Sequence, residues 1–242
     1  MLCDFLRPTD LLDFSSIDIQ DLIATRGWQQ LSDYDRIGAI YDFVRNEIKF
    51  GYNRNDDLQA SEVLTDGYGQ CNTKGTLLMA LLRALGISCR LHGFTIMQKL
   101  QEGAIPTIII KLAPQKILHS WVEVKLNGVW INLEGFILDD NYLHQIQSKF
   151  ADKYDEFCGY GIATKCLKSP QVDWQGQDTF IQKEGIVDDL GVFDSPDEFY
   201  AAYGTNLRGI KRWLYQYIIR HLINANIERL RKKQFITQPK SI

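Results

Sequence analysis

The sequence lacks a long apolar run and the features of a targeting signal. Near its middle, the longest purely apolar run covers residues 77–82, far short of the roughly 20 residues that cross a bilayer. Residues 1–7 are followed by acidic residues and not by the apolar stretch of a signal peptide. The sequence therefore predicts no membrane span and a cytoplasmic location.

Cysteine and histidine are scarce, and neither is spaced for a metal. The cysteines form an odd set without a Cys-x-x-Cys pair, which argues against a disulfide framework and against a cysteine zinc site. No histidines fall at helical ligand spacing. We therefore expect neither a metal nor a cofactor. The residues concerned are Cys3, Cys71, Cys89, Cys158 and Cys166, and His92, His119, His144 and His221.

Acidic residues outnumber basic ones before residue 207, and basic residues dominate after it. The net charge is −3, yet residues 207–233 contain eight lysines and arginines against one glutamate, a net +7. With Lys240 adding one more positive charge, residues 1–206 carry −11. An acidic body and a basic segment can complement each other, whereas nucleic-acid binding usually requires a basic fold. We therefore expect no nucleic-acid partner.

The composition is that of an ordinary globular protein. Its 242 residues are 45% hydrophobic and 24% charged, which makes disorder an improbable description and allows one large core. We expect residues 1–205 to form one domain with its core at 35–136. Residues 206–242 are expected to form a basic helix and tail that pack on that domain.

Helical patterns surround a group of predicted strands. Ser32 can cap a helix with apolar positions to residue 48, and residues 73–85 form a nearly all-apolar helix that Gly86 ends, with Lys74 expected in solvent. Strands are predicted at 87–96, 107–112, 117–126 and 129–133, whereas 145–203 are expected to be loops with short elements. The resulting fold class is α+β with an antiparallel sheet.

The predicted C-terminal helix, residues 207–230, has a broad apolar stripe. A basic amphipathic helix can pack on its own domain or on lipid. Core packing is favoured because the stripe contains so many large side chains. The stripe comprises Ile210, Trp213, Leu214, Tyr217, Ile218 and Leu222.

Cys71 is the first candidate for chemistry. It follows a loop with Gly67 and Gly69 and enters the buried helix, where free N–H groups and the helix dipole favour a thiolate. A small buried hydrophobe is the alternative interpretation, and it fits Cys89 and Cys166 better. We expect Cys71 to be the most reactive thiol of the five.

The hairpin at Asn127-Gly128 places a histidine near a carboxylate. A two-residue turn there pairs Leu126 with Val129, so paired residue numbers sum to 255. Glu134 then faces Trp121 and is the diagonal neighbour of His119, within reach of a long side chain. Asn132 lies on the same face, one pair further from His119. These residues can form a thiol triad of Cys71, His119 and Glu134, with Asn132 as the secondary choice for the third member; ordinary surface charges are the alternative interpretation.

Several segments together resemble the transglutaminase-like superfamily, over roughly residues 35–136. The resemblance implies a papain-related fold in which Cys71 is the nucleophile, His119 the histidine and Glu134 the third member. The family usually has Asp, often followed by Pro, where this chain has Glu134-Gly135. The segments are Gly69-Gln-Cys71, residues 77–87, Cys89-Arg90, His119-Ser-Trp-Val-Glu-Val124 and Asn127-Gly-Val-Trp130.

From these residues we predict a cofactor-independent cysteine enzyme that cleaves a peptide, protein or small amide through a thioester. The Cys71 N–H is expected to stabilise the oxyanion, together with Asn53 or Gln70. Hydrolysis is favoured over transamidation because water is abundant and no amine pocket is recognisable. A transglutaminase-like fold that serves as an inactive binding module is the alternative from a different class.

Overall fold

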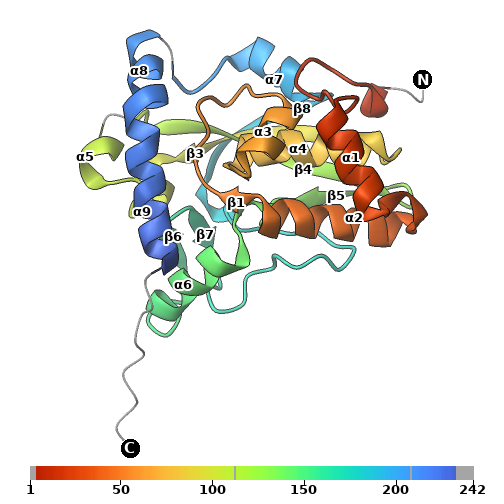
Figure 1. The fold of residues 1–242 in the computed structure, drawn as a ribbon. Helices are drawn as coiled ribbons and strands as arrows, with labels where there is room; N and C mark the ends of the chain where they lie inside the picture. The colour runs from red at the N-terminus through yellow and green to blue at the C-terminus, as the bar shows by residue number, and fades with distance from the viewer. Residues whose placement is uncertain (1–3, 112, 208, 233–242) are drawn as a thin grey trace, which may run out of the picture.

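The computed structural model describes residues 4–111, 113–207 and 209–232. Figure 1 shows helices from both ends of the chain around a central helix and a sheet. The α-helices are α1 (Ile17–Arg26), α2 (Asp33–Asp42), α3 (Ala60–Asp66), α4 (Cys71–Ala84), α5 (Thr107–Ile110), α6 (Asp140–Phe150), α7 (Pro196–Tyr203), α8 (Gly209–Leu214) and α9 (Arg220–Lys232). The strands are β1 (Lys49–Phe50), β2 (Tyr68–Gly69), β3 (Cys89–Met97), β4 (Lys116–Leu126), β5 (Val129–Leu133), β6 (Phe157–Gly159), β7 (Ile162–Thr164) and β8 (Ile186–Phe193).

The main sheet of the described residues has four antiparallel strands in the order β5-β4-β3-β8. The turn at Asn127-Gly128 joins β4 to β5, and both turn residues have positive φ, as a tight hairpin turn requires. Val122 pairs with Leu133 and Leu126 with Val129. The predicted α+β class and the predicted hairpin register are confirmed.

Helix α4 forms the centre of the core (Figure 1). It contacts β4 on one side and α2 and α3 on others, so it is buried nearly all round. The helix ends at Ala84, and Gly86 follows with a φ of 76°. The prediction that Lys74 points into solvent is wrong. Its side chain is fully buried, and its Nζ donates to the carbonyl oxygens of Arg45 and Ile137.

The predicted strand at 107–112 is wrong where the structure describes it. Residues 107–110 form the short helix α5, and the N–H of Ile109 donates to the carbonyl of Pro106 at 2.8 Å. Two physical reasons apply. Proline favours the start of a helix, and β3 already pairs with β4 on one edge and β8 on the other. Residue 112 lies outside the described part of the chain.

The region 145–203 is more ordered than the sequence pattern indicates. It contains part of α6, the β6-β7 hairpin, the edge strand β8 and helix α7. The burial of β8 does not alternate strictly along the strand, and its pairing with β3 shifts register twice. These irregularities explain why a period-two search misses it.

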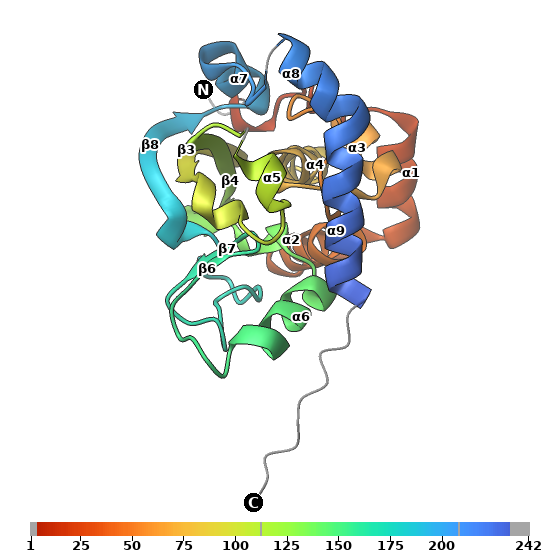
Figure 2. The same cartoon turned by 90° about the vertical axis from the view of Figure 1, so that its left-hand side faces the viewer.

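The C-terminal helix runs from residue 209 to residue 232 as α8, a π-helical turn (η7, Tyr215–Ile219) and α9. In Figure 2 it forms one column beside α5. Most of its predicted apolar stripe faces solvent: Ile210 is 82% exposed and Trp213 56%. The buried residues are instead Ile223, Ile227, Leu230 and Arg231. The body-facing residues recur every three or four positions across the π turn, so they form an ordinary helical stripe that lies beside the predicted one: Arg212, Tyr215, Ile219, Ile223, Ile227 and Leu230.

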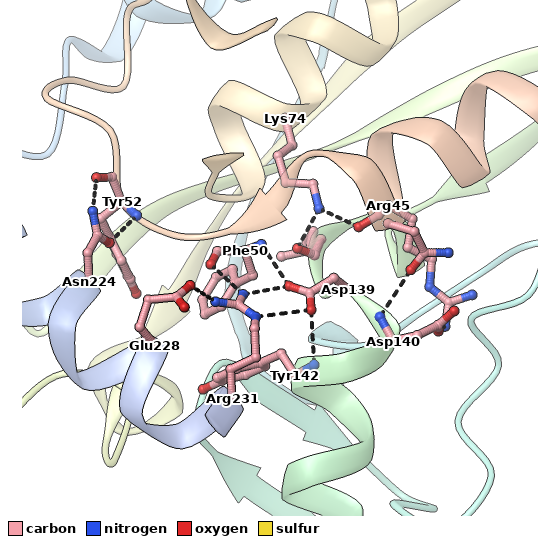
Figure 3. Close-up of polar contacts among 12 residues, drawn as sticks. Arg45, Phe50, Tyr52, Lys74, Asp139, Asp140, Tyr142, Asn224, Glu228 and Arg231 are labelled. Carbon is pink, nitrogen blue, oxygen red and sulfur yellow. Dashed lines mark hydrogen bonds and ion pairs between the residues drawn. The ribbon is translucent and has the colours of Figure 1, made fainter. Parts of the chain in front are cut away.

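Polar contacts hold the lower part of this helix to the body (Figure 3). Arg231 donates to Asp139 at 2.7 Å and to the carbonyl of Phe50 at 3.0 Å, and both charged side chains are buried. Asn224 exchanges two hydrogen bonds with the backbone of Tyr52, each below 3.0 Å: 2.8 and 2.9 Å. The helix therefore packs on the body, although through a face other than the predicted one. A domain boundary at 205/206 stays a prediction, and residues 233–242 lie outside the described chain.

Within the described ranges, no helix is long and apolar enough to cross a membrane.

Candidate active site

Cys71 is the first residue of α4, and the backbone before it is tightly packed. Gln70 is the N-cap, and its N–H donates to the Thr73 hydroxyl at 3.1 Å. A Cβ on Gly69 would lie 2.7 Å from that hydroxyl oxygen and 2.9 Å from the side chain of Lys74, so this position requires glycine. The first N–H groups of a helix have no acceptor within the helix. Hence the Cys71 thiol lies beside unpaired donors and the positive end of the helix dipole.

The Cys71 side chain is largely but not fully buried, with 8% of the residue exposed. Its Sγ lies 3.6 Å from Oδ1 of Asn72. Asn72 in turn accepts a hydrogen bond from Ser120 on β4 and donates to the Leu118 carbonyl. Asn72 thus connects the start of α4 to the strand that carries His119.

His119 lies on β4 and is fully buried. Its Nε2 lies 2.9 Å from Oε1 of Glu134, whereas its Nδ1 makes no hydrogen bond of ordinary geometry with the described residues. Burial disfavours the charged imidazole, but the nearby Cys71 sulfur and the Glu134 carboxylate outweigh it and raise the pKa of His119 to about 10. The imidazole therefore connects the thiol and the acid electrostatically.

Glu134 follows the last residue of β5 and is also fully buried. One carboxylate oxygen faces His119. The other accepts hydrogen bonds from the backbone N–H groups of Ile181 and Gln182, both at 2.9 Å. Such charge-assisted bonds are among the stronger hydrogen bonds in proteins. The longer glutamate is thus held at both oxygens, with its charge directed at the imidazole.

Asn132, the secondary choice, lies elsewhere. It pairs with Glu123 across the hairpin, its N–H donates to Asp178, and its carbonyl accepts from the N–H of Thr179. Of the two sequence-derived candidates, Glu134 is the one that contacts His119.

The two oxyanion candidates differ in how their side chains are used. The Asn53 amide donates to Asp66 and to the Tyr68 carbonyl, and its oxygen accepts from Thr73. Gln70 donates one hydrogen bond, to Asp56, and lines a cavity together with Cys71. An amide NH₂ carries two donors. Only Gln70 of these two therefore combines a free donor with a place beside the thiol.

The cavity next to Cys71 has a volume of about 290 Å³. Its lining combines polar residues at the thiol end with apolar side chains from α5 and the C-terminal helix. The sequence patterns did not anticipate it, because its walls come from segments more than a hundred residues apart. The lining includes Tyr52, Gln70, Cys71, Ile105, Ile109, Leu118, Gln182, Leu214, Tyr215, Ile219 and Ile223.

Two further residues that support the site, Thr179 and Gln182, are not indicated by the sequence patterns. Thr179 accepts, through its hydroxyl, from the N–H groups of Glu134 and Gly135, and Gln182 donates to the Gly161 carbonyl at 2.6 Å. Residues 179–182 form a segment without a strand signature beyond one bridge to Leu133. No local sequence signal indicates that this segment holds Glu134.

The other cysteines have different surroundings. Burial raises the pKa of the Cys89 thiol to about 11 and also raises that of Cys158. Cys166 is exposed, and Cys3 lies outside the described residues. In the part of the chain that the structure describes, no three His, Cys, Asp or Glu side chains are grouped closely enough to hold a metal.

Comparison with known proteins gives one family match. The model of the transglutaminase-like superfamily matches residues 24–135, a segment that contains Cys71, His119 and Glu134. No curated protein matches the sequence.

Two solved structures resemble the chain at low identity. One is described as a "Putative Cysteine Protease" from Cytophaga hutchinsonii, with 16% identity, a TM-score of 0.48, and coverage of 81% of this chain and 48% of that chain. The other is red sea bream transglutaminase, with 15% identity, a TM-score of 0.31, and coverage of 52% of this chain and 25% of that one. The chain thus spans about half of the first protein's length and a quarter of the second's.

Proposed function

We propose that the chain is a cysteine-dependent amide hydrolase. The premise is that residues 24–135 form a domain of the transglutaminase-like superfamily. Cys71, His119 and Glu134 are its catalytic triad. The observation that carries the proposal is the buried 2.9 Å hydrogen bond between His119 and Glu134, which leaves the second ring nitrogen for the thiol.

The first half of the reaction makes a thioester. With the proton on His119, the Cys71 thiolate adds to the amide carbonyl carbon, forming the S–C bond. The oxyanion receives hydrogen bonds from the Cys71 N–H and from the free Gln70 amide donor. The C–N bond then breaks, and His119 gives its proton to the departing amine.

The second half releases the acid. His119, now neutral, takes a proton from water, which attacks the thioester carbon. The C–S bond breaks, and Cys71 leaves as a thiolate while His119 is again protonated. Throughout, Glu134 orients the ring and stabilises the imidazolium.

The two hydrogen bonds that Glu134 accepts from Ile181 and Gln182 support glutamate as the third member. These donors hold the carboxylate in place, so the extra methylene relative to aspartate need not loosen the geometry.

A hydrolysis screen tests this function. The purified chain is incubated with a diverse library of peptides and amides, and released amine is measured, with Cys71→Ala as the control. We expect cleavage that Cys71→Ala abolishes. Release of amine at equal rates by both proteins, or by neither, contradicts the proposal and favours a binding module.

The same assay separates hydrolysis from transamidation. A primary amine added in excess competes with water for the thioester. We expect the free acid to remain the main product by mass spectrometry. A product dominated by the new amide would assign the chain as a transamidase with the same triad.

A further inference from the structure

Most of the residues that line the cavity beside Cys71 are uncharged. Tyr52 donates its hydroxyl to Gln101, and burial raises the pKa values of Tyr52 and Tyr215 well above 10, so both rings stay neutral. The apolar part of the lining includes Ile219 and Ile223. This part disfavours a charged group, because burying an unpaired charge is very unfavourable.

Four charged residues line the cavity: Arg54, Asp56 and Arg212 are paired with protein groups, and Lys211 is exposed to solvent. Arg54 forms an ion pair with Glu62, and Arg212 forms one with Asp57 at 3.2 Å. Asp56 accepts hydrogen bonds from Gln70 and Asn206. These charges hold the walls together, and none of the pairs needs a ligand to complete it.

The far wall of the cavity is fixed. The C-terminal helix that supplies Tyr215, Ile219 and Ile223 is attached below by Arg231 and Asn224, as Figure 3 shows, and above by the contact of Arg212 with Asp57. A wall held at both ends sets a definite size for whatever occupies the space in front of it.

The volume indicates how large that occupant is. An apolar cavity of about 150 Å³ holds one benzene molecule. At about 290 Å³, this cavity has room for about twice as much, on the order of a dozen non-hydrogen atoms.

We propose that the cavity binds an apolar acyl group of about this size, attached to the carbonyl that Cys71 attacks. The inference rests on the proposed function and adds its substrate class. The acyl group is favoured over the leaving amine because it stays one bond from Sγ through both steps. The C-terminal helix, through Ile219 and its neighbours, determines the length that fits.

A series of chloromethyl ketones tests the inference. In each reagent the Cys71 thiolate displaces chloride, forming an S–CH₂ bond, and the apolar chain lies on the acyl side of the ketone. Chloroacetone serves as the reagent without a chain, and unbranched ketones carry chains of 5, about 10 and about 16 carbons, sizes chosen around the roughly dozen atoms that the volume allows. The readout is the second-order rate constant for modification of the Cys71 peptide, measured by mass spectrometry.

We expect the rate constant to rise with chain length by up to roughly fourfold for each methylene that enters the cavity. The rise should stop near ten to twelve carbons, where about a dozen atoms fill the space. If no reagent, chloroacetone included, modifies Cys71, the proposed function fails and the inference falls with it. If all reagents modify Cys71 at similar rates, the function stands and the inference alone is overturned.

Two tryptophan variants locate the chain. Ile219→Trp fills the cavity, whereas Ile218→Trp makes the same change at the neighbouring residue, which is 47% exposed. We expect the ratio of the ten-carbon to the chloroacetone rate constant to fall at least tenfold in Ile219→Trp and to stay within about twofold in Ile218→Trp, since the bulk of the ratio comes from buried methylenes. Ile219→Ala should shift the preferred chain to a longer one. Equal losses in both tryptophan variants would place the chain outside the cavity.

Discussion

The two halves of the chain contribute different things to one site. Residues 24–135 carry the thiol, the imidazole and the carboxylate, and a sequence pattern can identify them. Residues 136–232 carry no proposed catalytic group, yet they supply the N–H groups that hold Glu134 and the helix that walls the cavity. Reactive groups and the residues that support them are thus encoded in separate regions of this chain, of which only the first has a recognisable spacing.

The largest effect on activity is expected from a change at the acid, Glu134. Glu134→Gln keeps shape but removes the charge that stabilises the imidazolium. We expect kcat to fall by up to about 10⁴-fold, with a much smaller change in stability. The steady-state rate on a substrate from the hydrolysis screen measures this effect, and circular dichroism checks the fold.

The acid and the histidine should act as a unit. Glu134→Gln is expected to add little to the loss caused by His119→Ala, because triad members are strongly non-additive. Near-full activity in Glu134→Gln together with an inactive Asn132→Ala would mean that the third member is Asn132.

The contribution of residues 136–232 to stability can be tested where Arg231 attaches the C-terminal helix to the body. Arg231→Met leaves the carboxylate of Asp139 buried without its guanidinium. We expect a loss of about 3–5 kcal/mol in the free energy of unfolding. Urea denaturation measures it, and Arg229→Met, an exposed position on the same helix, should change stability by under about 0.5 kcal/mol.

This ion pair also predicts a pH dependence. Burial opposes ionisation of Asp139, but Arg231 outweighs it and holds the pKa of that carboxyl below its usual value. The folded state then binds fewer protons than the unfolded one, so the stabilisation is present above the unfolded pKa and is lost as pH falls through the folded one. Wild type and Arg231→Met should therefore converge in stability below about pH 4; a difference that stays constant down to pH 2 would contradict this account.

A smaller effect is expected at the segment that holds Glu134. Thr179→Val preserves shape but leaves the buried N–H of Gly135 without its hydroxyl acceptor. The expected cost is about 1–3 kcal/mol in the free energy of unfolding. The exposed position Thr65 provides the matched control, Thr65→Val. Equal stabilities of Thr179→Val and Thr65→Val would show that the Thr179 hydroxyl does not support the site.

A change in pH slope, and not in stability at neutral pH, is expected at Lys74 in the centre of the first half. Burial holds its pKa well below the usual value of 10.5. Between the two values the unfolded chain binds one proton more, so stability rises with pH by up to about 1.4 kcal/mol per unit. Lys74→Met should lose this slope between about pH 8 and 10, whereas Lys211→Met, at an exposed position, should keep it. Parallel pH profiles of wild type and Lys74→Met would show that the buried amine is charged.

Sequence reasoning succeeded where a local pattern controls structure. The place of Cys71 at the entrance of α4, predicted to begin at residue 73 and found to begin at Cys71, and the register of the Asn127-Gly128 hairpin both follow from short-range rules, and that register brings Glu134 near His119. It failed where long-range packing decides. The two edges of β3 were already paired, so residues 107–110 could not join the sheet there.

The face of the C-terminal helix failed for a related reason. Apolar residues lie on adjacent faces of this helix, so hydrophobicity alone does not show that Ile223 and Ile227 face the body while Trp213 stays exposed. The contacts of Ile181 and Gln182 with Glu134 use backbone N–H groups, which every residue except proline possesses. Side-chain identity therefore could not reveal them.

Competitive labelling of the cysteines tests the proposed triad of Cys71, His119 and Glu134 without the need for a substrate. Native protein is treated with limiting iodoacetamide at neutral pH, and the labelled peptides are quantified for wild type and for His119→Ala. Activation by His119 and the helix start predicts that Cys71, only 8% exposed, is labelled before the exposed Cys166, and that His119→Ala abolishes this preference. Earlier labelling of Cys166 in the wild type, or an unchanged preference for Cys71 in His119→Ala, would contradict the triad.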